Sequence, residues 1–254
     1  MAKDKIRQIG VVLATIVMLF VNVVANIIPI YGVTTGSISE TLNTYFEPAR
    51  YAFSIWGVIF LGLSLYSIYQ ALPAQKTNQK LRSIGWWYIG SGLTITAWMV
   101  FFHYQLYLFT LITMFVLVAI LVVIYEKLDI GRDAASPKMR YLVHMPFSIY
   151  LGWITMVVFA NVALFLQVNG WKGFGIDPKI WTVVMMAVTI VIAELTAFNR
   201  QDLVYLAVFV WAFIGIAVKH VGVSPIFEAA CVSAGIVVII TVITLIVRPK
   251  LNRQ

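Results

Sequence analysis

Long apolar runs separated by short polar breaks dominate the chain. Each run approaches the roughly 20 residues that a helix needs to cross a bilayer. The breaks contain residues that interrupt helices, such as Pro29, Gly36 and Pro178. The pattern predicts an all-α polytopic transmembrane bundle of about eight helices, at residues 8–29, 49–72, 84–102, 106–125, 142–166, 180–198, 203–219 and 227–247.

The composition changes this picture only by excluding other classes of protein. Apolar residues make up 61% of the chain and charged residues 11%, whereas a soluble domain carries roughly 25% charged residues. A water-soluble fold is therefore excluded. The net charge of +8 does not indicate nucleic acid, because the basic residues lie between apolar runs and form no amphipathic face. We expect the lipid bilayer as the main partner and no nucleic acid.

The basic residues indicate how the helices are oriented, since short cytoplasmic loops are enriched in Lys and Arg. The loop Ile30 to Glu47 has neither residue and is expected outside, although Lys172, Lys179 and Lys219 fall on the same side. The segments expected in the cytoplasm contain Lys3, Lys5, Arg7, Lys76, Lys80, Arg82, Lys127, Arg132, Lys138, Arg140, Arg200, Arg248, Lys250 and Arg253. With an even number of spans, both termini are cytoplasmic.

The first 25 residues also resemble a signal peptide, with basic residues before an apolar stretch. That stretch is too long for a typical signal peptide, and Asn22 and Asn26 interrupt its end. We therefore interpret it as the first transmembrane helix. Together with the family resemblance described below, this predicts a multi-pass protein of the bacterial inner membrane.

No motif points to an enzyme or to a resident cofactor. The chain lacks a P-loop, an HExxH zinc motif and a GxSxG nucleophile motif, and its acidic residues are scattered. Cys231 is the only cysteine, so neither an intrachain disulfide nor a cysteine-based zinc site can form. We expect no catalytic residue and no metal site, and enzyme activity has no support in these residues.

Aromatic and polar residues recur in three of the predicted helices. Phe53 and Trp56 share one face near the start of the second; Trp98 and Phe102 end the third, and Trp153 lies within the fifth. Tryptophan commonly collects at the membrane interface, which suits those close to span ends, Trp86, Trp87, Trp171 and Trp181. The deeper tryptophans are explained either by core packing or by a ligand pocket.

The order of these residues resembles the TspO/translocator protein family, the tryptophan-rich sensory proteins. The resemblance rests on Pro48, Phe53 and Trp56, on Trp98 with Phe101-Phe102, and on Pro146, Trp153 and Ala160-Asn161. That family has a five-helix bundle, a long first loop and a Trp-x-Pro-Pro signature. Here Phe46 replaces the usual Trp, Pro48 is single, and Phe53 to Trp56 is one residue shorter, as in a divergent branch.

The resemblance divides the chain and suggests a ligand. It covers about residues 8–167, so we expect a TspO-like five-helix module at 1–167 and three additional helices with a basic tail at 168–254. Family members bind porphyrins and, in some cases, sterols beneath the first loop, and act as disputed transporters, sensors or tetrapyrrole-degrading enzymes. The resemblance implies a pocket for a hydrophobic or tetrapyrrole ligand such as a porphyrin or haem. Its expected lining is Phe46, Pro48, Phe53, Trp56, Trp98, Phe102, Tyr150, Trp153 and Asn161.

Two other functions stay open. A proton-coupled secondary transporter of a small solute would use Glu194, Asn22 and Asn26, because carboxylates inside spans often mark proton pathways. The asparagines also suit interhelical hydrogen bonds, and Glu194 suits either a position at the cytoplasmic boundary or a pair with Arg200. A structural role in another membrane complex is the third class.

Two further features of the third predicted helix stay open. His103 is either a ligand of a porphyrin metal or an interfacial residue. Gly85, Gly90 and Gly92 would permit the close helix approach of a homo-oligomer.

Overall fold

The computed structural model describes residues 2–27, 44–132 and 135–251 of the chain. Over these ranges it contains eight long helices and no strand, which confirms the predicted all-α bundle. The long helices are α1 (Ala2–Ile27), α3 (Ile55–Ala71), α4 (Gln79–His103), α5 (Tyr107–Leu128), α7 (Met145–Val168), α8 (Pro178–Arg200), α9 (Leu203–Lys219) and α10 (Ile226–Leu251). The short elements are η1 (Arg50–Ser54), η2 (Pro73–Gln75), α6 (Pro137–Met139), the π-helical turn η3 (Arg140–His144) and η4 (Gly173–Gly175).

Six helical segments are long and apolar enough to cross a membrane, as far as the described residues extend. They are Lys3–Ala25, Arg50–Ala71, Tyr107–Leu128, Pro137–Val168, Pro178–Arg200 and Ile226–Ile246. Helix α9 is apolar but has only 17 residues. Helix α4 has 25 residues and includes several Gly, Ser and Thr residues. The chain is therefore a multi-pass membrane protein.

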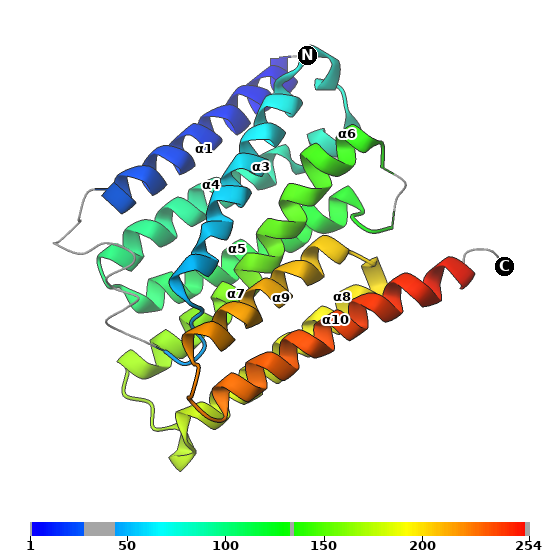
Figure 1. Cartoon of the computed structure of the whole chain (residues 1–254). Coiled ribbons are helices and arrows are strands. Elements are labelled where there is room, and N and C mark those ends of the chain that lie inside the picture. Colours follow the sequence, from blue (N-terminus) through cyan, green and yellow to red (C-terminus); the bar gives the residue numbers. More distant parts are fainter. Residues whose placement is uncertain (1, 28–43, 133–134, 252–254) are drawn as a thin grey trace.

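The helices form one continuous bundle (Figure 1). Helix α4 packs against α1 and α5, while α7 packs against α3, α5 and α9. Helices α8 and α10 pack against each other, and α10 also packs along α9. The amino end of α1 and the carboxyl end of α10 lie at the same end of the bundle (Figure 1). This arrangement is the one expected for an even number of membrane crossings.

The last three helices pack directly on the first five. At Gly152 of α7, an added methyl group would come within 3.1 Å of the Val208 side chain of α9. At Gly215 of α9, it would come within 2.9 Å of the Cβ atoms of both Pro48 and Ala52. Because glycine has no side chain, α9 approaches the rest of the bundle closely at both positions.

A polar network holds α5 against the junction of α8 and α9. Asp202 caps α9 by accepting hydrogen bonds from the backbone N–H groups of Val204 (3.1 Å) and Tyr205 (3.2 Å). The hydroxyl of Tyr125 on α5 donates to the second carboxylate oxygen of Asp202 at 3.0 Å. Arg200, which is 4% exposed, forms an ion pair with Glu126. Glu194, one candidate partner of Arg200, is instead exposed on α8.

Candidate functional site

Five aromatic residues of α3, η1 and α7 make a connected group inside the bundle, here called the aromatic cluster. Phe53 meets Trp153 edge-on, with ring centroids 5.8 Å apart, and Trp56 meets Tyr150 at 6.3 Å. Trp56 also stacks on Phe60 at 5.3 Å. These separations lie within the range of favourable aromatic pairs. The structure thus brings together four residues expected to line the pocket and adds Phe60, one helical turn after Trp56.

Helix α7 contributes differently to the aromatic cluster than η1 and α3 do. Tyr150 and Trp153 are fully buried, whereas Phe53 and Trp56 are half-buried. The indole Nε1 of Trp153 and the hydroxyl of Tyr150 are buried and have no hydrogen-bond partner among the described residues. Leaving such groups unpaired costs about 1–3 kcal/mol each. The cluster therefore combines large apolar surfaces with polar atoms that a bound molecule could satisfy.

A second set of expected residues joins α4 to α7. The Nε1 of Trp98 donates a hydrogen bond to Oδ1 of Asn161 at 3.2 Å, and Trp98 stacks on Phe102 at 5.1 Å. The side-chain amide of Asn161 also donates to the backbone carbonyl of Val157 at 2.9 Å. All three expected residues are buried. Their polar atoms are paired within the protein, so this set fixes the separation of the two helices.

Phe46 and Pro48 occupy separate surroundings. Phe46 is buried and lies 5.8 Å from the ring of Phe159 on α7. Pro48 lies against Gly215 of α9, and the next backbone N–H, that of Ala49, donates to the Gly215 carbonyl at 2.9 Å. The segment before α3 is therefore attached to α9 as well as to α7.

An ion pair strengthens this attachment of the segment to α9. Nζ of Lys219 lies 2.5 Å from Oε2 of Glu47, and both side chains are largely buried. Tyr45 lies 5.9 Å from the ring of His220. Burial lowers the pKa of the His220 imidazole, although its hydrogen bond to the Ile216 carbonyl opposes the shift. The sequence analysis missed this ion pair because its two residues lie far apart in the chain.

The residues expected in a proton pathway are not brought together. Asn22 is half-buried on α1, whereas Glu194 is exposed on α8, and these helices lie on opposite sides of the bundle (Figure 1). Asn26 lies in α1, but its side chain falls outside the described residues. The two side chains therefore lie on helices that are not neighbours in the bundle.

The structure also places the histidine considered as a metal ligand. His103 is 1% exposed, and its ring nitrogens lie 2.9 Å from the Met99 carbonyl and 3.2 Å from the Ala25 carbonyl. Both nitrogens therefore face the backbone of α4 and α1. Among the described residues, no group of three or more His, Cys, Asp or Glu side chains could hold a metal ion.

A separate apolar groove of about 380 Å³ lies between α9 and α10. It is lined by Ile214, Ala217, Val218, Val221, Phe227, Cys231 and Ala234. None of these residues was expected in the pocket, and none belongs to the aromatic cluster. The groove offers apolar contacts without a polar group to orient a ligand.

Together, the fold and the site define a multi-pass helical membrane protein with an aromatic interior. A model of the TSPO-like protein family matches residues 8–244, and the chain belongs to that family. The predicted TspO resemblance is thereby confirmed. The match continues past residue 167 into the last three helices, while the division at 167/168 itself stays a prediction. Comparisons with curated proteins and with solved structures give no match.

Proposed function

We propose that this TSPO-like membrane protein binds a flat, largely apolar molecule of the tetrapyrrole type at the aromatic cluster. The observation that carries the proposal is the pairing of half-buried Phe53 and Trp56 with buried Trp153 and Tyr150, whose polar atoms lack partners in the described protein. An extended ring system gains from stacking and from burial of its surface. Its nitrogen or oxygen atoms would pair with Trp153 Nε1 and the Tyr150 hydroxyl.

The structure favours this binding function over the transporter alternative. Proton-coupled transport through Asn22 and Glu194 needs these groups on one pathway, and their helices, α1 and α8, lie on opposite sides of the bundle (Figure 1). The aromatic cluster, in contrast, joins α7 to η1 and α3 through direct ring contacts. As part of the same proposal, both termini face the cytoplasm of a bacterial inner membrane, because Lys3, Lys5 and Arg82 lie at the end of the bundle that holds the amino terminus.

The proposal predicts that a Trp56→Ala, Trp153→Ala double variant binds protoporphyrin, haem or a sterol at least about tenfold more weakly than the wild type. Each lost aromatic pair contributes about 0.5–1.5 kcal/mol beyond simple burial. Tryptophan fluorescence of the detergent-purified protein is titrated with each compound. The midpoint is compared and not the amplitude, because a porphyrin also quenches distant tryptophans.

The matched control is a Trp86→Ala, Trp87→Ala double variant. These tryptophans are 59% and 42% exposed on α4 and lie outside the aromatic cluster. Their removal costs the same number of fluorophores and is expected to leave the midpoint within about twofold, since surface substitutions usually change free energies by less than about 0.5 kcal/mol. Equal weakening in both double variants would argue against binding at the aromatic cluster.

A further inference from the structure

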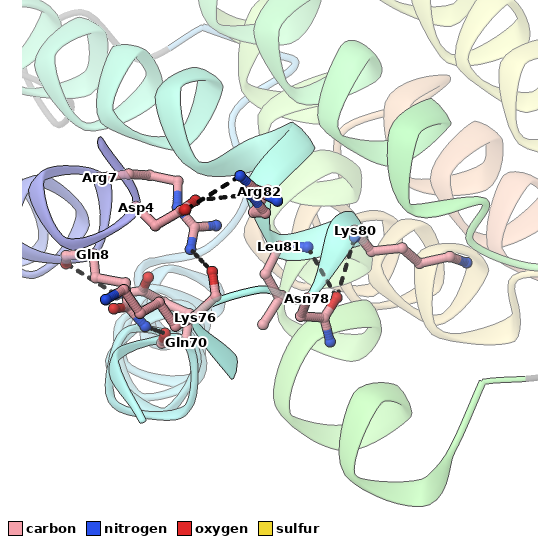
Figure 2. Close-up of polar contacts among 9 residues, drawn as sticks. All are labelled: Asp4, Arg7, Gln8, Gln70, Lys76, Asn78, Lys80, Leu81 and Arg82. Atoms are coloured by element: carbon pink, nitrogen blue, oxygen red, sulfur yellow. Dashed lines mark hydrogen bonds and ion pairs between the residues drawn. The ribbon is translucent and has the colours of Figure 1, made fainter. Parts of the chain in front are cut away.

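One arginine is buried where α1, α3 and α4 meet at the end of the bundle (Figure 2). Arg7 of α1 is only 3% exposed, and its stem lies against Gly85 of α4, where an added methyl group would come within 2.6 Å of Arg7 Cδ. Its Nη2 donates to the Lys76 carbonyl at 3.1 Å, in the turn between α3 and α4. The lack of a side chain at Gly85 thus leaves room for the stem of Arg7 inside the protein.

The nearby acidic residue is already occupied by another arginine. Both carboxylate oxygens of Asp4 contact Arg82, at 2.7 Å from Nε and 3.2 Å from Nη2 (Figure 2). This two-point geometry is the strong form of an arginine–carboxylate pair. Asp4 still acts on Arg7 electrostatically, but among the described residues it accepts no hydrogen bond from Arg7. The positive charge of Arg7 is therefore only partly balanced.

The polar atoms of Arg7 are also incompletely used. Nε and Nη1 are buried and have no hydrogen-bond partner among the described residues. The hydroxyl of Tyr66 on α3 is likewise buried without a described partner, and Tyr66 interacts electrostatically with Arg7. Burying a cation without a partner is strongly unfavourable. Such an arrangement is stabilised by an anion that accepts hydrogen bonds from the free donors.

The surroundings indicate which anion. Lys3 and Lys5 are exposed near Arg7 in the chain, Lys76 is half-buried, and Arg82 is exposed. The membrane-crossing part of α1 begins at Lys3, so these groups lie at the level of lipid headgroups. Basic pockets between transmembrane helices at this level bind anionic headgroups. A planar guanidinium with free donors matches the oxygen atoms of a phosphate group.

We propose that the junction of α1, α3 and α4 is a phosphate-binding site. Arg7 is its buried ligand, Tyr66 supplies an additional hydroxyl donor, and Lys76 and Arg82 form its basic rim. The phosphate belongs either to an anionic phospholipid headgroup or to a free phosphate ion. None of these residues belongs to the aromatic cluster, and the site does not depend on the function proposed for that cluster.

The test measures the binding of phospholipids and of inorganic phosphate to the delipidated full-length protein in neutral detergent. Native mass spectrometry counts bound phosphatidylglycerol and phosphatidylcholine of identical chain length, and thermal unfolding is followed in inorganic phosphate and in chloride at equal ionic strength. We expect phosphatidylglycerol to bind at least about tenfold more tightly than phosphatidylcholine. Arg7→Gln is expected to lower the affinity for phosphatidylglycerol about tenfold. Tyr66→Phe, which removes only the hydroxyl, is expected to weaken binding by about threefold.

The control variant is Arg140→Gln, which makes the same charge change at an exposed residue of η3. It is expected to keep the wild-type preference within about twofold. If inorganic phosphate stabilises the wild type and Arg7→Gln abolishes that effect, the site binds a free phosphate ion. If phosphatidylglycerol is preferred and inorganic phosphate has no effect, the site binds a lipid headgroup. The proposal is overturned if wild type shows neither effect, or if Arg140→Gln loses as much as Arg7→Gln. Should Arg7→Gln fail to fold, the lipid and phosphate measurements on the wild type and on Tyr66→Phe still test the site.

Discussion

Replacing Gly131 with alanine is expected to destabilise the folded protein by about 3–5 kcal/mol. Gly131 has a φ of +81°, which alanine adopts only at a cost. More importantly, the new methyl group would lie 1.7 Å from the backbone carbonyl oxygen of Arg200. The turn after α5 would have to move away from the end of α8 and disturb the ion pair of Arg200 with Glu126. Thermal or denaturant unfolding in detergent measures the loss.

Gly222→Ala is the control for the backbone contribution. Gly222 has a nearly identical φ of +79°, but a methyl group there would meet nothing within 4 Å. This variant is expected to lose only about 1–2 kcal/mol, the cost of the left-handed conformation. Equal losses of stability in Gly131→Ala and Gly222→Ala would refute the close contact between Gly131 and the Arg200 carbonyl.

Replacing Gly215 with valine is the second change with a large expected effect, a loss of about 2–3 kcal/mol. Even a single methyl group at this position would come within 2.9 Å of Pro48 and Ala52. Valine would push α9 away from the segment before α3 and strain two contacts. These are the hydrogen bond from Ala49 to Gly215 and the one from Trp211 Nε1 to the Ala52 carbonyl, both 2.9 Å long. Unfolding measurements and ligand titration are made on the same sample.

The titration connects this stability effect with the aromatic cluster. Phe53 directly follows Ala52, so displacing the segment should also weaken binding of protoporphyrin. Gly235→Val on α10 is the control, because nothing lies within 4 Å of the added Cβ. Valine forms helices more readily than glycine, so this control should be neutral or slightly stabilising. Unchanged stability in Gly215→Val would contradict the packing of α9 against this segment.

The sequence predicted the helices well because the information for them is local. Apolar runs and helix-breaking residues determine where membrane helices begin and end, and the aromatic residues keep their order along those helices. Helix ends were less predictable: α1 begins at Ala2 and not at residue 8, and its first turns are held by contacts of Asp4 and Arg7 with the α3–α4 turn and α4. Hydropathy does not register such polar contacts between helices.

The candidate site was predictable only in part, for a related reason. The pairing of Phe53 with Trp153 follows from placing deep aromatic residues on neighbouring helices, as the resemblance suggested. The docking of Pro48 on Gly215 joins distant parts of the chain, and neither residue has a pattern that indicates the other. Arg7 was interpreted as a topology signal, yet its side chain is buried with unpaired donors. Whether such a side chain is buried depends on how distant helices pack, and the hydropathy pattern along the chain does not indicate that packing.

The most direct test of the central claim is the equilibrium binding of protoporphyrin to the purified full-length protein, with empty detergent micelles as the reference. A specific aromatic site predicts saturation near one molecule per chain, with a dissociation constant of about micromolar order, corresponding to about 8 kcal/mol of binding free energy. Uptake that rises linearly and equals the uptake into empty micelles would contradict tetrapyrrole binding by this TSPO-like protein.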